Sequence, residues 1–352
     1  MSRSGTLLVD TSFLGDVLCA EPMVRRAAEL WPDEPVDFLA QPSGAGMLAG
    51  HPQLRELKTY DKRGAQRGFG GLRRLAAELR AVGYARAVCS HRSWRTALLL
   101  RLAGIPERTC FHNASGAWLY TQKVRYPAEL HEIQRNLALV EAAAGAGGGE
   151  PAWTPPRMFP SEAERRTARE LVPLDAYVAV APGSIWATKR WPAESFRELV
   201  DALTHEGQAV VLVGGPDDRE LCADVAAASP APAPGSAPVA GQVIDLAGRT
   251  TLRESYAVLE RAACLVTNDS APMHLGVAAG IPVVAAFCST VPAFGFAPRG
   301  PRDVVLEVAG LDCRPCGIHG HPACPQEHFR CGRDLSVATV LSAVQERLAA
   351  PV

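Results

Sequence analysis

The chain has 352 residues, with 36 lysine and arginine residues against 37 aspartate and glutamate residues, so its formal net charge is −1. This balance gives no overall positive field, and we therefore expect no nucleic-acid partner. The sequence shows no signal-peptide pattern and no apolar run long enough to span a bilayer. A chain of this length is more typical of two hydrophobic cores than of one.

The first half of the chain alternates short apolar runs with helical patterns. We expect strands in TLLVD, VDFLA, RELKTY and ARAVCS, and helices over about 17–31, in LRRLAAELRAVG, over 94–103 and over 131–144. Strands separated by single helices are typical of a parallel sheet that is covered on both faces.

The same rhythm restarts after the aperiodic stretch GAGGGEPAWTPPR, with strands expected in YVAVAP, QAVVLVGG, VIDLAG, CLVTND and PVVAAF. We therefore predict an α/β protein with two Rossmann-like, doubly wound domains facing each other across a cleft that holds the ligands. The predicted parts are an N-terminal domain (1–145), a linker (146–158), a C-terminal domain (159–335) and a last helix (336–352) that packs back on the first domain. The Pro/Ala-rich segment 229–241 is expected to be a surface loop.

Two loops of the second domain have the composition of an anion site. APGSIWATKRWP contains a small-residue turn (Gly183, Ser184), a hydroxyl (Thr188) and two adjacent cations (Lys189, Arg190). Small residues let backbone N–H groups approach an anion that the cations neutralise. An ordinary turn with two solvated charges is the alternative.

The second of these loops, VTNDSAPMHLGVAAG, leads into a helix whose N-terminal amides attract anions. Asp269 or Ser270 can cap this helix, Pro272 suits its first turn, and His274 would lie near the same anion. A capping role alone for Asp269 is the alternative. Together the two loops predict a cradle for the diphosphate of a nucleotide sugar, with no motif that would hold Mg²⁺.

Several motifs resemble glycosyltransferase family 9, the bacterial ADP-heptose:lipopolysaccharide heptosyltransferases. The motifs are SFLGDV, PGSIWATKRWP and VTNDSAPMHL followed by PVVAAF, and HRSWRTALLLRLAGIPERT, HEIQRNLALVE and TVPAFGFAPRGP are similar to the heptosyltransferase II branch. The resemblance implies a GT-B fold and an inverting reaction that needs no metal. It also implies an ADP-heptose donor and a Kdo-containing lipid A acceptor that already carries one heptose.

The resemblance also assigns roles to residues by their motif positions. Asp16 falls on the proposed catalytic base, and Lys189 on the lysine that binds the diphosphate. Ser184 and Thr188 lie in the donor loop, as do Asp269, Ser270 and His274 in the second loop. Two departures from the family pattern are Ala271, where glycine is usual, and Cys288-Ser289 in place of Gly-Pro. If the glycine needs a positive φ, alanine weakens donor binding, and a non-catalytic binding protein becomes an alternative function, as does transfer with another sugar or acceptor.

Asp16 is the carboxylate expected to take a proton from the acceptor hydroxyl. It stands in a loop with one glycine after the first strand, where a dinucleotide-binding fold would carry several glycines. The dipole of the following helix would stabilise its ionised form. A role as a helix cap only is the alternative.

The first domain also supplies the basic residues that an anionic acceptor needs. Lys62, Arg63, Arg92 and Arg95 are the candidates, with Arg92 and Arg95 just past the end of ARAVCS. We expect a cytoplasmic enzyme that touches the inner face of the inner membrane through its lipid substrate and does not insert.

The cysteines fall into two groups. Six stand singly in apolar segments, as buried thiols of a reducing cytoplasm do. The other four, Cys313, Cys316, Cys324 and Cys331, have the spacing C-x2-C-x7-C-x6-C with histidines between them. This spacing favours a structural zinc site that takes no part in catalysis. Redox-labile thiols and an uncommitted loop are the alternatives, and an iron–sulfur cluster is less favoured.

Overall fold

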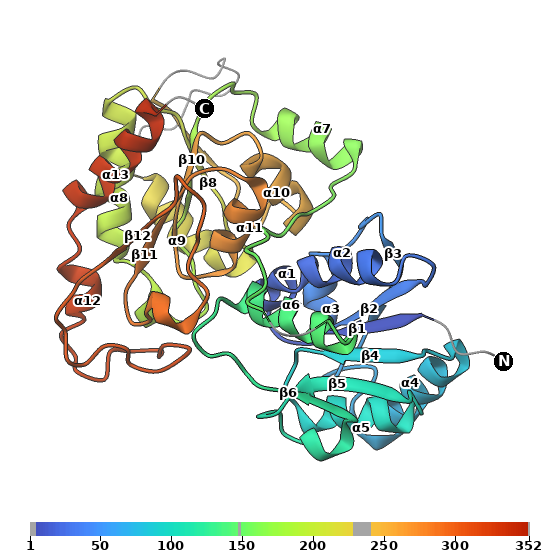
Figure 1. Ribbon diagram of the computed structural model, residues 1–352. Helices are drawn as coiled ribbons and strands as arrows, with labels where there is room; N and C mark the ends of the chain where they lie inside the picture. The colour runs from blue at the N-terminus through green and yellow to red at the C-terminus, as the bar shows by residue number, and fades with distance from the viewer. Residues whose placement is uncertain (1–4, 147–148, 228–240, 351–352) are drawn as a thin grey trace. The chain divides into compact units, whose positions relative to one another are not determined.

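The computed structural model describes residues 5–146, 149–227 and 241–350 (Figure 1). The chain divides into two compact units, Met1–Phe159 and Pro160–Val352. Each unit is built around one six-stranded sheet with all neighbouring strands parallel. The predicted α/β class with two Rossmann-like, doubly wound domains is therefore confirmed. Most of the predicted loop 229–241, residues 147 and 148 of the predicted linker, and residues 351 and 352 lie outside the described residues.

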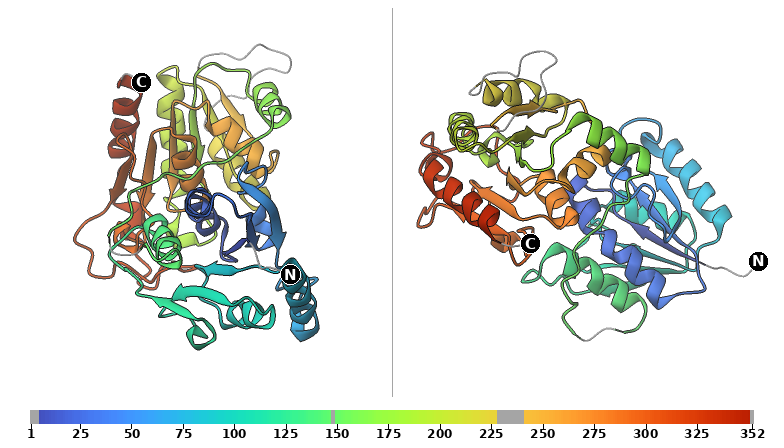
Figure 2. Two further views of the ribbon diagram at one scale, coloured as in Figure 1. Left: turned by 45° about the vertical axis from the view of Figure 1, so that its right-hand side comes forward. Right: turned by 90° about the horizontal axis from the view of Figure 1, so that it is seen from above.

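The first unit has the strand order β3-β2-β1-β4-β5-β6. Its elements are β1 (Thr6–Val9), α1 (Leu14–Cys19), α2 (Glu21–Leu30), β2 (Val36–Ala40), α3 (Pro42–Ala45), β3 (Leu54–Thr59), α4 (Gly68–Val82), β4 (Arg86–Cys89), α5 (Trp94–Leu102), β5 (Glu107–Phe111), the 3-10 turn η1 (Ala117–Leu119), β6 (Gln122–Val124) and α6 (Glu132–Ala143). Helices cover both faces of the sheet (Figure 2). Leu7 and Val9 of β1 pack with α4 and α5 on one face, and α1, α2 and α6 contact one another on the other.

The helix predicted over 17–31 is two helices. The chain turns at Ala20, between the end of α1 at Cys19 and the start of α2 at Glu21. The cause is Pro22 in the first turn of α2, because its ring nitrogen has no hydrogen to continue the hydrogen-bond ladder of α1. The break leaves α1 a short helix of 6 residues that directly follows the loop after β1.

The segment 149–159, predicted mainly as linker, is irregular and packs on the first unit. Arg25 donates from Nη2 to the carbonyl of Pro155 at 2.7 Å, and the buried carboxylate of Glu21 accepts from the amide of Arg157 at 3.0 Å. The Trp153 ring stands edge-on to His131, with ring centroids 4.7 Å apart. These contacts explain why the first compact unit extends to Phe159.

The second unit has the strand order β12-β11-β10-β7-β8-β9. Its elements are α7 (Glu162–Leu171), β7 (Val178–Ala181), η2 (Ala187–Lys189), α8 (Ala193–His205), β8 (Val210–Leu212), η3 (Pro216–Asp218), α9 (Arg219–Ala226), β9 (Val243–Asp245), α10 (Leu252–Leu259), β10 (Cys264–Asn268), α11 (Ala271–Ala279), β11 (Val283–Phe287), η4 (Pro292–Phe294), β12 (Val304–Glu307), α12 (Arg330–Arg333) and α13 (Val337–Ala349). Strands β7, β10 and β11 are buried along their whole length, which agrees with their continuous apolar sequences.

The last helix packs in the second unit. Helix α13 contacts α8, β10 and β11, and Val340, Ala343 and Val344 lie in the core of that unit. The structure thus assigns this helix to the second unit, and its predicted packing back on the first domain stays a prediction. No helix within the described ranges has both the length and the apolar character that crossing a membrane requires.

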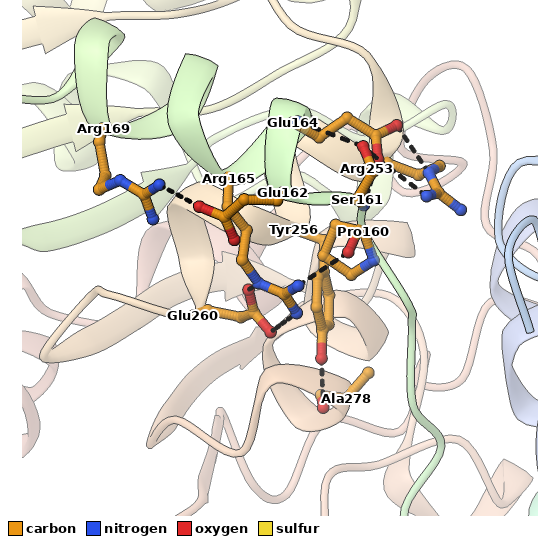
Figure 3. Close-up of polar contacts among 10 residues, drawn as sticks. All are labelled: Pro160, Ser161, Glu162, Glu164, Arg165, Arg169, Arg253, Tyr256, Glu260 and Ala278. Atoms are coloured by element: carbon orange, nitrogen blue, oxygen red, sulfur yellow. Dashed lines mark hydrogen bonds and ion pairs between the residues drawn. The ribbon is translucent and has the colours of Figure 1, made fainter. Parts of the chain in front are cut away.

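Helix α7 is attached to α10 mainly by ion pairs (Figure 3). Arg253 of α10 forms a bidentate pair with Glu164, at 2.7 and 2.8 Å, and Arg165 forms one with Glu260, at 3.1 Å for both bonds. Ala168 is the buried residue of α7. Polar contacts therefore carry much of the attachment of this helix.

Candidate functional site

The loops after β7, β10 and β11 meet at the carboxyl edge of the second sheet, because these three strands are neighbours. The direction in which successive strands are added reverses between β7 and β10. In open α/β sheets, ligands bind at such a switch point. Both loops predicted to bind an anion, one in 181–192 and the other in 266–280, begin here.

The centre of this edge is an ion pair between Lys189 and Asp269. Lys189 Nζ lies 2.6 Å from Asp269 Oδ2, with side chains 15% and 11% exposed. The hydroxyl of Thr290, in the loop after β11, donates to the same carboxylate oxygen at 2.7 Å. Burial, with the nearby Lys189 charge, lowers the pKa of His274 to about 4, although Asp269 acts in the opposite direction. The imidazole is therefore neutral at pH 7.

Asn268, the last residue of β10, holds the loop after β7 in place. Its side-chain oxygen accepts from the amide of Trp191 at 2.8 Å, and its side-chain nitrogen donates to the carbonyl of Pro182 at 2.8 Å. Asn268 is fully buried, and a buried amide must be satisfied in this way. Sequence reasoning missed this residue, although a polar residue that ends an apolar strand is a usable signal.

Gly183 and Ser184 form a tightly packed turn. A Cβ atom on Gly183 would lie 2.2 Å from Asp218 Oδ1, so a larger residue there would require the Asp218 carboxylate to move. Arg190 donates from Nε to the carbonyl of Ser184 at 2.6 Å. Arg190 thus braces the turn, and of the two adjacent cations it is Lys189 that reaches Asp269.

Thr188 is buried and held by hydrogen bonds, and Ser270 stands just before α11. Thr188 is 3% exposed, and its hydroxyl lies 3.1 Å from Ser289 Oγ and accepts from the amide of His321 at 2.8 Å. Ser270 occupies the N-cap position of α11 without a capping hydrogen bond from its side chain. The start of α11 follows Asp269 and Ser270 directly in the chain and receives no capping bond from the Ser270 side chain.

Ala271 fits its place in the backbone. It is the first residue of α11, and Glu327 and Phe329 are the non-glycine residues with positive φ in the described part of the chain. Since Ala271 does not have a positive φ, alanine carries no conformational penalty there. The departure from glycine thus gives no backbone reason to expect a non-catalytic protein.

Asp16 lies in the first turn of α1 and is partly exposed. Its Oδ2 accepts from the amide of Phe13 at 3.1 Å. This bond satisfies one of the amides that a helix N-terminus leaves without a partner. The structure therefore shows the capping contact, which orients the carboxylate at the carboxyl edge of the first sheet.

Two further carboxylates near this edge were not predicted. Asp10, just after β1, is 2% exposed and accepts from the Ser90 hydroxyl at 2.5 Å and from the amide of Ser12 at 2.8 Å. Burial raises the pKa of Glu132, against the effect of Arg135, which lies 3.0 Å away. The sequence pattern did not mark either residue as a site candidate.

Lys62 belongs to a polar cluster at the same edge. Its Nζ lies 3.3 Å from the carbonyl of Thr11 and 3.4 Å from His91 Nδ1. His91 Nδ1 also lies 2.9 Å from the Thr11 hydroxyl. Burial lowers the pKa of Lys62 to about 8 and that of His91 to about 4. The Lys62 ammonium group is therefore held in place by its contacts with Thr11 and His91.

The other three basic candidates, all arginines, differ in exposure and in their hydrogen bonds. Arg63 and Arg92 are exposed, and the Arg92 guanidinium lies 4.9 Å from the centre of the Tyr126 ring. Arg95 is committed internally, since it donates to the Tyr60 hydroxyl at 2.7 Å, to the carbonyl of Gln66 in the loop after β3 and to that of Gly68 at the start of α4.

The four clustered cysteines were predicted to hold zinc, and the described structure gives no support for this site. Within the residues that the structure describes, no group of three or more His, Cys, Asp or Glu side chains is arranged to hold a metal ion. Cys331 is buried in the second core, and the Cys316 thiol is turned toward the carbonyl of Cys313, at 3.2 Å. The predicted zinc site is therefore unsupported.

Two parallel, doubly wound units of this kind define a GT-B fold. The solved structure of the E. coli ADP-heptose LPS heptosyltransferase II has the same fold, with a TM-score of 0.78 over 98% of each chain and 24% identity. Residues 72–323 match the profile of glycosyltransferase family 9 (heptosyltransferase). The chain belongs to this family and is therefore a glycosyltransferase.

Two curated relatives from E. coli K12 match most of the chain. Lipopolysaccharide heptosyltransferase 3 is 28% identical over 78% of this chain and 80% of its own length. Lipopolysaccharide heptosyltransferase 2 is 26% identical over 82% of this chain and 84% of its own length. Both relatives are thus matched along most of their length.

Proposed function

We propose that this enzyme transfers L-glycero-D-manno-heptose from ADP-heptose to heptosyl-Kdo₂-lipid A of the lipopolysaccharide inner core, with inversion and without a catalytic metal. The family membership and the names of the relatives support the reaction class. The observation that carries the proposal is the Lys189–Asp269 pair at the start of α11.

The donor diphosphate would bind at the carboxyl edge of the second sheet. Lys189 supplies a full positive charge, and the first turn of α11 supplies amides and the positive end of the helix dipole. Asp269 and Thr290 hold the ammonium group in one position before the donor arrives. These groups stabilise the charge that develops on the diphosphate as the sugar leaves, which is the task that a metal performs in other transferases.

Asp16 would act as the general base. Inversion requires one carboxylate that takes the proton of the acceptor hydroxyl as the oxygen attacks the anomeric carbon. Asp16 is partly exposed and is oriented by the amide of Phe13. Asp10, by contrast, is buried and occupied by Ser90 and Ser12.

The acceptor phosphates and Kdo carboxylates would meet the cations of the first unit. Arg63 and Arg92 are exposed and suit direct contact, whereas Lys62 and Arg95 hold the surrounding loops. We propose that the enzyme works at the cytoplasmic face of the inner membrane, which it touches through this unit. Trp94 and Trp118 are 59% and 77% exposed, and exposed tryptophans of this kind favour the membrane interface.

The test is Lys189→Met, which keeps the aliphatic stem and removes the charge. We expect kcat/KM to fall about 100-fold or more, equivalent to roughly 3 kcal/mol, because the transition-state charge loses its counter-charge. Release of ADP, UDP and GDP from the corresponding sugar donors is measured with and without the lipid A acceptor. Thermal unfolding serves as the control for folding, and wild-type turnover in a folded Lys189→Met variant would contradict the proposed donor site.

A further inference from the structure

The cysteine-rich segment, although it holds no metal site, packs directly on the donor loops. Its first part, residues 313–321, contacts the loop after β7 at Thr188 and Lys189 and the loop after β11 at Ser289 and Thr290. We call this part the 313–321 segment. Lys189 is one member of the ion pair, and Thr290 donates to the other member, Asp269. The segment therefore packs against residues of the proposed diphosphate site.

The contact with the loop after β7 is a pair of hydrogen bonds between Thr188, in η2, and His321. The amide of Thr188 donates to the carbonyl of His321 at 3.1 Å, and the Thr188 hydroxyl accepts from the amide of His321 at 2.8 Å. The His321 ring lies 2.6 Å from the carbonyl of Cys316, which closes the segment on itself. Thr188, next to Lys189 in the chain, is thus fixed from outside its own loop.

The contact with the loop after β11 reaches Asp269 through Thr290. Arg314 is 6% exposed in its side chain, and its Nε and Nη2 both donate to the carbonyl of Thr290, with 3.0 Å for Nε. The hydroxyl of Thr290 donates to Asp269 Oδ2, the oxygen that also pairs with Lys189. A shift of Arg314 would therefore move Thr290 and, with it, the ion pair.

Gly320 is the point of closest approach. Its φ is +82°, and an added Cβ would lie 3.0 Å from Lys189 Cγ, 3.1 Å from Ser289 Oγ and 3.1 Å from Thr188 Oγ1. These distances are shorter than ordinary van der Waals contact, so a side chain there would push on both donor loops together. The position requires glycine for its backbone and for the space beside Lys189.

We propose that the 313–321 segment positions the donor loops, with Gly320 and Arg314 as positioning residues that set where Lys189 and Asp269 stand. The proposal rests on the proposed function, in which these two residues form the diphosphate site. It gives the cysteine-rich segment a role in donor affinity that needs neither a metal nor a contact with the donor.

Gly320→Ala tests the proposal, with Gly310→Ala as the matched control. Both glycines have positive φ, +82° and +71°, so alanine strains both, but a Cβ at Gly310 would meet no atom within 4 Å. Calorimetric titration of the full chain with ADP, and separately with inorganic pyrophosphate, should show affinity about tenfold weaker for Gly320→Ala. Gly310→Ala should bind both like the wild type, with a similar thermal midpoint in the two variants.

Arg314→Lys provides a second variant if Gly320→Ala fails to fold. It keeps the positive charge next to Glu307 and removes the fork that holds the Thr290 carbonyl. The donor KM should rise several-fold while kcat changes little, because the segment acts on the position of the bound diphosphate and not on the proton transfer at the acceptor.

The outcomes separate this proposal from the proposed function. If Lys189→Met leaves pyrophosphate and ADP affinity unchanged, the diphosphate site itself is misplaced. If Lys189→Met weakens both ligands but folded Gly320→Ala or Arg314→Lys binds them like the wild type, the positioning role is wrong. Equal losses in Gly320→Ala and Gly310→Ala would also overturn it, since backbone strain alone would then explain the result.

Discussion

Asp16 has a structural contact and a proposed chemical role at once. Its carboxylate accepts the amide of Phe13 at 3.1 Å, and a carboxylate can accept more than one hydrogen bond, so this contact does not rule out a bond to an acceptor hydroxyl. An asparagine can keep the bond to Phe13 through its amide oxygen, yet it cannot take a proton at neutral pH. The two roles therefore respond differently to the same substitution.

We expect Asp16→Asn to remain folded, to bind ADP like the wild type and to lose transfer at least about 100-fold, since it lacks the base. Asp16→Ala should lose transfer as well, with stability lower by about 1 kcal/mol because the amide of Phe13 loses its acceptor. Calorimetry with ADP, an acceptor-transfer assay and urea unfolding measure the three quantities. An active Asp16→Asn enzyme would leave Asp16 with the capping role alone.

Sequence reasoning selected the proposed donor residues but not the contacts that hold them. Lys189 and Asp269 were predicted by motif and composition, and the structure brings them within 2.6 Å. The inward hydroxyl of Thr188 depends on His321, which lies 133 positions further along the chain, and local pattern does not report such a partner. Arg95 was predicted for the acceptor, although its hydrogen bonds to the loop after β3 could be seen only in three dimensions.

At the scale of elements, the apolar runs predicted the buried strands, because burial on both faces leaves a continuous apolar signature. The pattern missed β5, β6 and β12, which carry charged or partly exposed residues. It also merged α1 and α2, since the hydrophobic period continues across the turn at Ala20 while Pro22 interrupts the hydrogen bonds.

Helix α7 shows how polar contacts can attach an element. Hydrogen bonding with Arg253, followed by that with Ser161, lowers the pKa of Glu164 to about 2 against the effect of burial. A carboxyl group with a depressed folded-state pKa contributes stability above its unfolded-state pKa. That contribution falls as pH drops through the folded-state pKa. The window here runs from about pH 4.5, the ordinary value, down to about pH 2.

We expect Arg253→Met to lower the free energy of unfolding by about 1 kcal/mol at pH 6, since Glu164 is 24% exposed in its side chain and solvent screens part of the pair. The difference from the wild type should shrink below pH 4.5, because Glu164 becomes protonated in the unfolded chain, and should vanish as pH falls through the folded-state pKa near 2. Urea unfolding at pH 6, 4 and 3 measures it. Arg169→Met, which removes an exposed pair from the same helix, should have no measurable effect, and a pH-independent loss in Arg253→Met would contradict the assignment.

At the scale of the whole molecule, the net charge of −1 gives no general attraction to an anionic membrane. The proposed membrane contact must therefore depend on local groups. In the first unit, the turn into η1 lies against the start of α5, since a Cβ on Gly116 would be 3.1 Å from Trp94 Cα. This places the exposed Trp94 and Trp118 on neighbouring turns, with the exposed Arg92 just before α5.

We expect the double substitution Trp94→Ala and Trp118→Ala to weaken sedimentation with phosphatidylglycerol vesicles at least about threefold, because two interfacial side chains are removed. Added salt should weaken wild-type binding further through the arginines. Ile318→Ala, at a residue of the second unit that is 66% exposed, serves as the matched control. Equal loss in the control variant would show that any exposed apolar residue suffices and would contradict a specific surface.

The two sheets have the same winding. Numbered within its own unit, each has the order third, second, first, fourth, fifth, sixth. The proposed base follows the first strand of one sheet, and the proposed diphosphate lysine follows the first strand of the other. The same strand order thus occurs twice in the chain, with a carboxylate in the loop after one first strand and a lysine in the loop after the other. Within the described residues no strand ladder joins the two sheets, so, under the proposed function, a descendant lineage can acquire a new acceptor by altering the loops of one copy while the proposed donor site is inherited unchanged in the other.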